Sequence, residues 1–242
     1  MKIHGADGTA VAQKLFSSSD EQFHELGFKA VGGGRTFRYA KAGAVALVVG
    51  NALQARIEDT DHDIIACRAT AIGARALLIT TGSGSGALDE NEYEGGFAVI
   101  DTTGGIGYCY SLGGHAAIAA STNGELPLVD GETVQVALDT SSKITLAVNP
   151  YKAVIQHPVT TATNSCVGGA IYPIAIAEFG WIQTGGLGAA LIAGTPGAGQ
   201  PVTSTGAVAG ALSVHSAELN AVATMECTGR DGKVLPVMWL LD

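Results

Sequence analysis

The densest group of side chains with chemical potential is an acidic segment at residues 58–63, in which aspartates alternate at Asp59, Asp61 and Asp63. Alternating carboxylates are the spacing of the first ligands in a calcium-binding loop. The rest of such a loop does not follow, because Ile64 stands where glycine is required and Thr70 where a bidentate carboxylate is required. We therefore interpret the segment as a solvated acidic turn, with a weak cation site at an assembly interface as the alternative.

The remaining candidate groups do not complete a reactive site. The six histidines are isolated in the sequence and form no HxH or HExxH pair. The four cysteines form no CxxC pair, so we predict buried, reduced thiols at Cys67, Cys109, Cys166 and Cys227. The Gly-Ser-Gly-Ser-Gly run at 82–86 is followed by no P-loop lysine and no nucleophile-elbow pattern, which favours an exposed, mobile loop. The sequence thus predicts no catalytic residue, no cofactor and no metal ligand.

The composition favours assembly through protein contacts over binding of nucleic acid. Of 242 residues, 47% are hydrophobic, 34 are glycine and only 14% are charged, against about 25% charged in an average domain. A net charge of −9 with scattered basic residues argues against a nucleic-acid partner. No apolar run approaches about 18 residues, so no membrane partner is expected. The polar start at residues 1–8 does not look like a signal peptide, which predicts synthesis and assembly in the cytoplasm.

The elements that must position these groups are predicted to be strands. Residues 9–26 have hydrophobic side chains at loosely helical spacing, which predicts a short N-terminal helical segment. Beyond Gly27 the chain consists of short apolar runs separated by glycine-rich turns, a pattern typical of an all-β, mainly antiparallel sandwich or barrel. Candidate strands include 44–49, 75–81, 133–137, 143–148, 180–184, 189–193, 219–226 and 234–241. Trp181 and Trp239 lie in such runs and are expected in the core, with an interface role as the alternative.

The domain organisation that follows is an N-terminal arm over residues 1–26 and a β-rich domain over residues 27–242. Two packed β subdomains within the second region are an open alternative. Because the polar arm differs in composition from the rest of the chain, we predict that it contacts a partner.

Several segments resemble a group of tailed-phage virion proteins that are common in marine phages and are encoded near the major capsid protein. The resemblance rests on residues 26–28, 37–43, 133–151, 179–186 (Phe-Gly-Trp-Ile-Gln-Thr-Gly-Gly) and 193–202 (Ala-Gly-Thr-Pro-Gly-Ala-Gly-Gln-Pro-Val), and so covers most of the chain from about residue 26. It implies a capsid decoration (cement) protein on the outer surface of the virion head. The implied partners are the major capsid protein and further copies of the chain in a homotrimer.

Other functions remain as alternatives. A tail-tube, head-fibre or spike protein would share the β-rich composition. An enzyme such as a glycan hydrolase needs paired carboxylates in a cleft, and the acidic residues available for this are Glu58, Asp59, Glu92 and Glu94. Because these residues fall in loop-like acidic clusters, we predict that the chain is not an enzyme.

Overall fold

The computed structural model describes residues 2–242 with the exception of 85, 103, 160–161, 205–207 and 216–219. The chain divides into two compact units, and each is described by itself. Unit 1 combines Met1–Ile57 with Pro150–Asp242, and unit 2 is Glu58–Asn149. In the described residues the named elements are strands and one short 3₁₀ turn, which confirms the all-β prediction.

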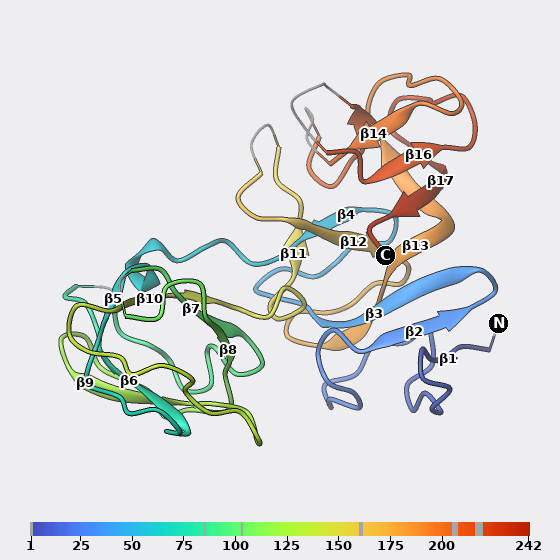
Figure 1. Ribbon diagram of the computed structural model, residues 1–242. Helices are drawn as coiled ribbons and strands as arrows, with labels where there is room; N and C mark the ends of the chain where they lie inside the picture. Colours follow the sequence, from blue (N-terminus) through green and yellow to red (C-terminus); the bar gives the residue numbers. More distant parts are fainter. Residues whose placement is uncertain (1, 85, 103, 160–161, 205–207, 216–219) are drawn as a thin grey trace. The chain divides into compact units, whose positions relative to one another are not determined.

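Unit 1 contains an 11-stranded sheet in which the named strands pair antiparallel. Its strands are β1 (His4–Gly5), β2 (Lys29–Gly32), β3 (Arg35–Lys41), β4 (Ala52–Gln54), β11 (Ile155–Gln156), β12 (Cys166–Ala170), β13 (Phe179–Ile192), β14 (Pro201–Thr203), β15 (Ser213–Val214), β16 (Ala223–Met225) and β17 (Lys233–Leu240). The main path runs β1-β2-β3-β13-β17-β16-β14-β15, and β12 also pairs with β13 and joins β4 and β11 to the sheet. The long β13 therefore links the strands of both chain segments (Figure 1).

Unit 2 contains a 6-stranded antiparallel sheet in the order β8-β7-β10-β5-β6-β9 (Figure 1). Its elements are the 3₁₀ turn η1 (Thr60–His62) and the strands β5 (Ile65–Cys67), β6 (Ala76–Thr80), β7 (Phe97–Ile100), β8 (Cys109–Ser111), β9 (Asn123–Pro127) and β10 (Lys143–Ala147). One face of this sheet supplies an aliphatic core that includes Ile79, Ile100 and Ile144, all fully buried. Because side chains alternate along a strand, the core positions recur at every second residue.

The core of unit 1 is richer in aromatic rings. Phe37, Tyr39, Phe179 and Trp181 form one buried cluster, in which the ring centroids of Tyr39 and Trp181 lie 5.1 Å apart. Trp239 anchors a second cluster beneath β17. Trp181 and Trp239 are only 1% and 2% exposed, which confirms that both tryptophans pack in the core.

The predicted N-terminal helical segment is wrong. Residues 9–26 form no helix, because their polar groups bond to the sheet instead of to each other along a helix. The backbones of Ser19 and Phe179 exchange two hydrogen bonds, and the Gln13 side chain donates to the Phe179 carbonyl oxygen and accepts from the Tyr39 hydroxyl at 2.5 Å. Leu15 packs into the aromatic cluster. Loosely helical spacing in the sequence therefore reflects side chains that alternate irregularly between the core and solvent.

Several strand predictions also need correction. The predicted strands 180–184 and 189–193 are parts of the single strand β13, and residues 133–137 form no strand. In 44–49 only Leu47 makes a β-bridge, to Ile174. Part of the predicted strand 219–226 lies outside the described residues, as does Ser85 in the predicted mobile loop 82–86.

Candidate functional site

The most distinctive surface in the described residues is an uncharged face on the paired strands β13 and β17. These strands pair from Gly185↔Leu240 to Ile192↔Lys233, and paired residues of an antiparallel ladder share a face. The outward positions are all apolar, and we call them the apolar face: Leu187, Ala189, Leu191, Val234, Pro236, Met238 and Leu240. The alternate positions point into the core around Trp239.

The apolar face is open to solvent in unit 1. Leu187, Val234 and Leu240 are 51%, 53% and 51% exposed. Strands that read as continuous apolar runs are typically covered on both faces, and β17 is such a run, with the sequence Lys-Val-Leu-Pro-Val-Met-Trp-Leu. Here one face meets the core and the other meets water. Contiguous exposed apolar surfaces are a common feature of protein interaction sites.

A glycine-rich bulge shapes the start of this face. The register of β13 against β3 shifts between Gln183 and Gly185, and the Gln183 side-chain amide donates to the carbonyl oxygens of Gly185, Gly186 and Leu187 at 3.0–3.1 Å. Gly186 has φ +79°, and a Cβ at this position would lie 2.2 Å from the Gly34 carbonyl oxygen. Only glycine fits there without moving the backbone, so the glycines bend the strand and do not end it.

Polar groups border the apolar face on two sides. On the β16 side, Thr224 pairs with Met238, and the next residue pair places Glu226 beside Pro236. At the other border the Asp242 carboxylate accepts hydrogen bonds from Arg38 Nε and Nη2 at 2.7 and 2.6 Å, and from Lys29 Nζ at 3.2 Å. These hydrogen bonds hold the pKa of Asp242 well below its usual range. An uncharged centre with a polar rim is the usual anatomy of a protein–protein interface.

The exposed apolar surface continues past the end of β13. The Leu191 amide donates to the Gly50 carbonyl oxygen at 2.7 Å, and a Cβ on Gly50 would touch Val234. The residues before Gly50 include Val48 and Val49, 51% and 49% exposed. The 44–49 run, which the sequence suggested as a strand, therefore extends this surface.

In unit 2, the three aspartates that suggested a calcium loop do not form a converging group of ligands among the described residues. Among the described residues, the group whose ligand atoms converge is Asp59, His62 and Glu92, with all three atoms within 4.8 Å of one another. Asp61 and Asp63 are not members. Ile64, which stands where a calcium loop has glycine, has φ 54°, the left-handed conformation that glycine adopts most easily. The aspartates before it nevertheless do not converge on one point.

This group also includes two of the four carboxylates considered for hydrolysis. Asp59 and Glu92 come together, whereas Glu58 and Glu94 are exposed and lie outside the group. Sequence reasoning missed His62, which is buried between them, because its position depends on a loop more than twenty residues away. The alternation of aspartates gave no signal for it.

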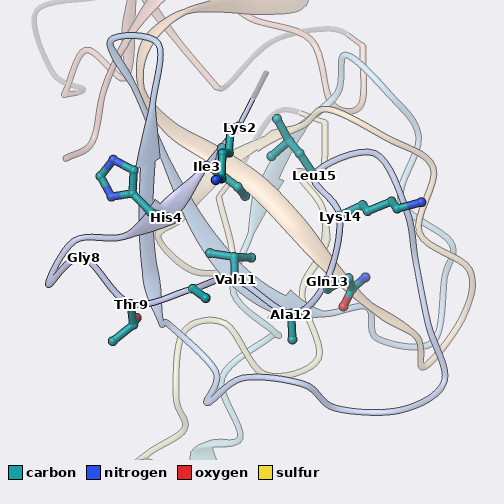
Figure 2. Close-up of a pocket in the computed structure, with 11 residues that line it drawn as sticks. Lys2, Ile3, His4, Gly8, Thr9, Val11, Ala12, Gln13, Lys14 and Leu15 are labelled. Atoms are coloured by element: carbon teal, nitrogen blue, oxygen red, sulfur yellow. The ribbon is translucent and has the colours of Figure 1, made fainter.

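A third feature is a hollow of about 730 Å³ at the N-terminus of unit 1. It lies between the segment Lys2–His4 and the loop that runs through Val11 to Leu15, as Figure 2 shows. The side chains of His4 and Lys14 point away from one another in this view. Its lining mixes apolar side chains with polar ones, and because His4 and Lys14 diverge, they do not form a converging pair of ligands there.

The cysteine prediction holds in part. Cys67 is buried, and burial raises the pKa of its thiol to about 11, as expected for an inert core cysteine. Cys109 is exposed, so the prediction of a buried thiol is wrong there. Cys166 and Cys227 are partly buried, and all four cysteines are free.

No family model, curated protein or solved structure matches the chain. Within the described residues, no helix is long and apolar enough to cross a membrane. The fold and the apolar face define a class, a β-rich protein with an exposed apolar sheet surface.

Proposed function

We propose that the chain is a structural protein of a tailed-phage virion that binds the outer surface of the head and stabilises contacts between capsomers. Its partners in this proposal are the major capsid protein and further copies of itself, in a homotrimer. The apolar face is the observation that carries the proposal, because a free monomer gains nothing from an uncharged face open to water. The sandwich or barrel arrangement expected from the sequence belongs to the same proposal.

The distribution of charge supports self-association through unit 1. Unit 2 carries 13 acidic and 3 basic residues, a net charge of −10, whereas unit 1 carries 9 acidic and 10 basic residues, a net charge of +1. Like charges on facing surfaces repel, so copies meet at least cost through unit 1. The apolar face has no charged side chain and is the part of unit 1 best suited to such a contact.

Repetition makes a modest interface effective on a capsid. A standard protein interface buries roughly 800 Å² per partner, and many such contacts around a closed shell act together by effective concentration. A protein that bridges capsomers adds buried area that must be exposed before the shell opens. Such a role needs no catalytic residue, in line with the prediction that the chain is not an enzyme.

The N-terminal arm fits the capsid-binding part of the proposal. Its inner side is fixed to unit 1 by Gln13 and Leu15, while Phe16 and Phe23 are 55% and 46% exposed. Deleting the arm would uncover the aromatic cluster, so substitution of the two exposed rings is the cleaner perturbation. Phenylalanine rings on an otherwise polar segment are suitable anchors for a partner's apolar pocket.

The test is co-expression of the chain with the major capsid protein of the phage that encodes it, followed by sedimentation of the heads. We expect the chain to sediment with the heads and the Phe16→Ser/Phe23→Ser variant to remain in the supernatant. Failure of the unaltered chain to bind heads contradicts the head assignment. Rings formed by the isolated chain would instead indicate a tail-tube protein.

Self-association is tested separately by light scattering on the purified chain, whose monomer mass is 24.4 kDa. We expect about three times this mass and a shift to the monomer in Leu187→Asp/Val234→Asp, because a charge in a dry interface is costly. Ile72→Asp/Ile106→Asp is the matched control, since both side chains are exposed in unit 2. A monomeric unaltered chain, or an oligomer that survives the first variant, contradicts the role of the apolar face.

A further inference from the structure

We propose that unit 2 holds a divalent transition-metal ion, of the Zn²⁺ or Mn²⁺ class, between Asp59, His62 and Glu92. The ligand atoms of these three side chains lie within 4.8 Å of one another. They come from two separate loops of the unit, so an ion there links the turn η1 to the loop that precedes β7. The site is independent of the proposed virion role.

The imidazole of His62 is already oriented for a ligand. Its Nε2 lies 3.1 Å from the Ala87 carbonyl oxygen, which can only accept, so Nε2 carries the proton. In the neutral ring Nδ1 is then the nitrogen with the lone pair, which accepts a hydrogen bond from the Tyr93 hydroxyl at 2.6 Å, with Asp59 Oδ2 3.7 Å away. A histidine that donates one ring N–H to a backbone carbonyl and offers the other nitrogen is the usual arrangement at a metal ion.

The two oxygens of the Asp59 carboxylate have different partners. Oδ1 accepts from the Asp61 amide at 3.1 Å and caps the 3₁₀ turn. Oδ2 faces His62 Nδ1 at 3.7 Å. Metal–ligand bonds of about 2.0–2.2 Å place neighbouring ligands of a tetrahedral ion roughly 3.4 Å apart, so this pair needs only a small movement.

Glu92 supplies the third ligand from the opposite loop. Its Oε2 accepts from the Asp89 amide at 3.1 Å, which fixes the loop that carries the carboxylate. The Tyr93 hydroxyl lies 2.6 Å from His62 Nδ1 and donates to it when no ion is present. An ion bound about 2.1 Å from Nδ1 takes the place of this hydrogen bond, so the Tyr93 hydroxyl must move away from the nitrogen when the ion binds.

The chemistry of the ligands selects the class of ion. One imidazole nitrogen with two carboxylates suits Zn²⁺ or Mn²⁺, whereas Ca²⁺ takes six to eight oxygen ligands. His62 is buried, while the Asp59 side chain is 39% exposed and leaves a path from solvent. The net charge of −10 on unit 2 attracts cations and is partly neutralised by one that binds.

The experiment is titration calorimetry of the full chain with ZnCl₂, MnCl₂ and CaCl₂. We expect one Zn²⁺ per chain, with Ca²⁺ much weaker. Asp59→Asn and Glu92→Gln should each weaken Zn²⁺ binding about 100-fold or more, because loss of even an outer-shell partner costs 10–100-fold. Glu90→Gln removes the same charge from an exposed neighbour outside the group and should bind Zn²⁺ like the unaltered chain.

Two further measurements distinguish zinc binding at this site from binding elsewhere in the chain and from an effect of the substitutions on folding. Hydrogen exchange should show Zn²⁺-dependent protection confined to residues 58–64 and 87–95. The Co²⁺-loaded chain should lack a thiolate charge-transfer band, since no cysteine takes part. The inference is overturned by absence of Zn²⁺ and Mn²⁺ binding, by equal affinity in Asp59→Asn and Glu92→Gln, by a thiolate band, or by Ca²⁺ binding as strong as Zn²⁺ binding.

Discussion

The two units of this chain differ more in charge and core composition than in secondary structure. Both are antiparallel β structures, yet the net negative charge lies in unit 2, at −10 against +1 for unit 1. Unit 1 holds both tryptophans and the apolar face, and unit 2 has a largely aliphatic core. The difference is the basis of the proposed division of roles, in which unit 1 would make the apolar contacts and unit 2 carries the negative charge.

Destabilising each core in turn tests whether the two units unfold independently, and it has the largest expected effect. Trp239→Ala should cost about 3–5 kcal/mol and Ile144→Ala about 2–5 kcal/mol, because both side chains are fully buried. If the units unfold separately, each substitution lowers the transition of its own unit alone. Tryptophan fluorescence reports unit 1, since Trp181 and Trp239 both lie there, and hydrogen exchange of β7 and β10 reports unit 2.

A single cooperative transition in both variants would contradict independent units. In that case fluorescence and hydrogen exchange would shift together, whichever core is altered. The control is Val208→Ala, a side chain that is 47% exposed in unit 1 and should change neither transition by more than about 0.5 kcal/mol.

The all-β class could be predicted from the sequence because glycine-separated apolar runs are a local signal. The division into units could not, since it depends on β3 pairing with β13 across about 140 residues, with register such as Trp181↔Tyr39. The glycines within 185–188 also led to a wrong expectation. In the sequence they indicate a turn between the predicted strands 180–184 and 189–193, but in the folded chain they lie within β13. Gly186 and Gly188 make room there for the Gly34 backbone and the Gln183 side chain.

The apolar face and the metal-ligand group could not be predicted from local sequence patterns either. Residues 234–241 are apolar throughout, so nothing in the sequence says that one face of this strand is exposed or which face the core covers. For the metal group, Asp59 was identified within its own segment and Glu92 only as one of several acidic residues. His62 joins them because Ala87 and Tyr93 fix its ring, and contacts between distant loops leave no spacing pattern.

Because the units differ in net charge, their stabilities should respond differently to ionic strength. At about 0.01 M salt the screening length is about 30 Å, and at 0.15 M it is about 8 Å, so repulsion among the carboxylates of unit 2 is strong only at low salt. We expect added NaCl to stabilise unit 2 by about 1 kcal/mol and to leave unit 1 nearly unchanged. Urea unfolding at the two salt concentrations, followed by the probes given above, checks this. A larger salt effect on unit 1 would contradict the expectation that repulsion among the carboxylates destabilises unit 2.

The smallest effect concerns the border of the apolar face at Asp242. Its pKa in the folded chain is lowered, first by the Arg38 hydrogen bonds, so the folded state favours the ionised carboxylate more than the unfolded state does. The resulting stabilisation is present above the unfolded pKa, near 3.9, and is lost as pH falls below it. Because the pair lies near the surface, we expect about 1 kcal/mol. Asp242→Asn should remove this acid dependence from the fluorescence transition of unit 1, whereas Asp231→Asn, an exposed carboxylate of the same unit, should retain it. An unchanged pH profile in Asp242→Asn would show that the Arg38 contact adds nothing to the stability of the unit that carries the apolar face.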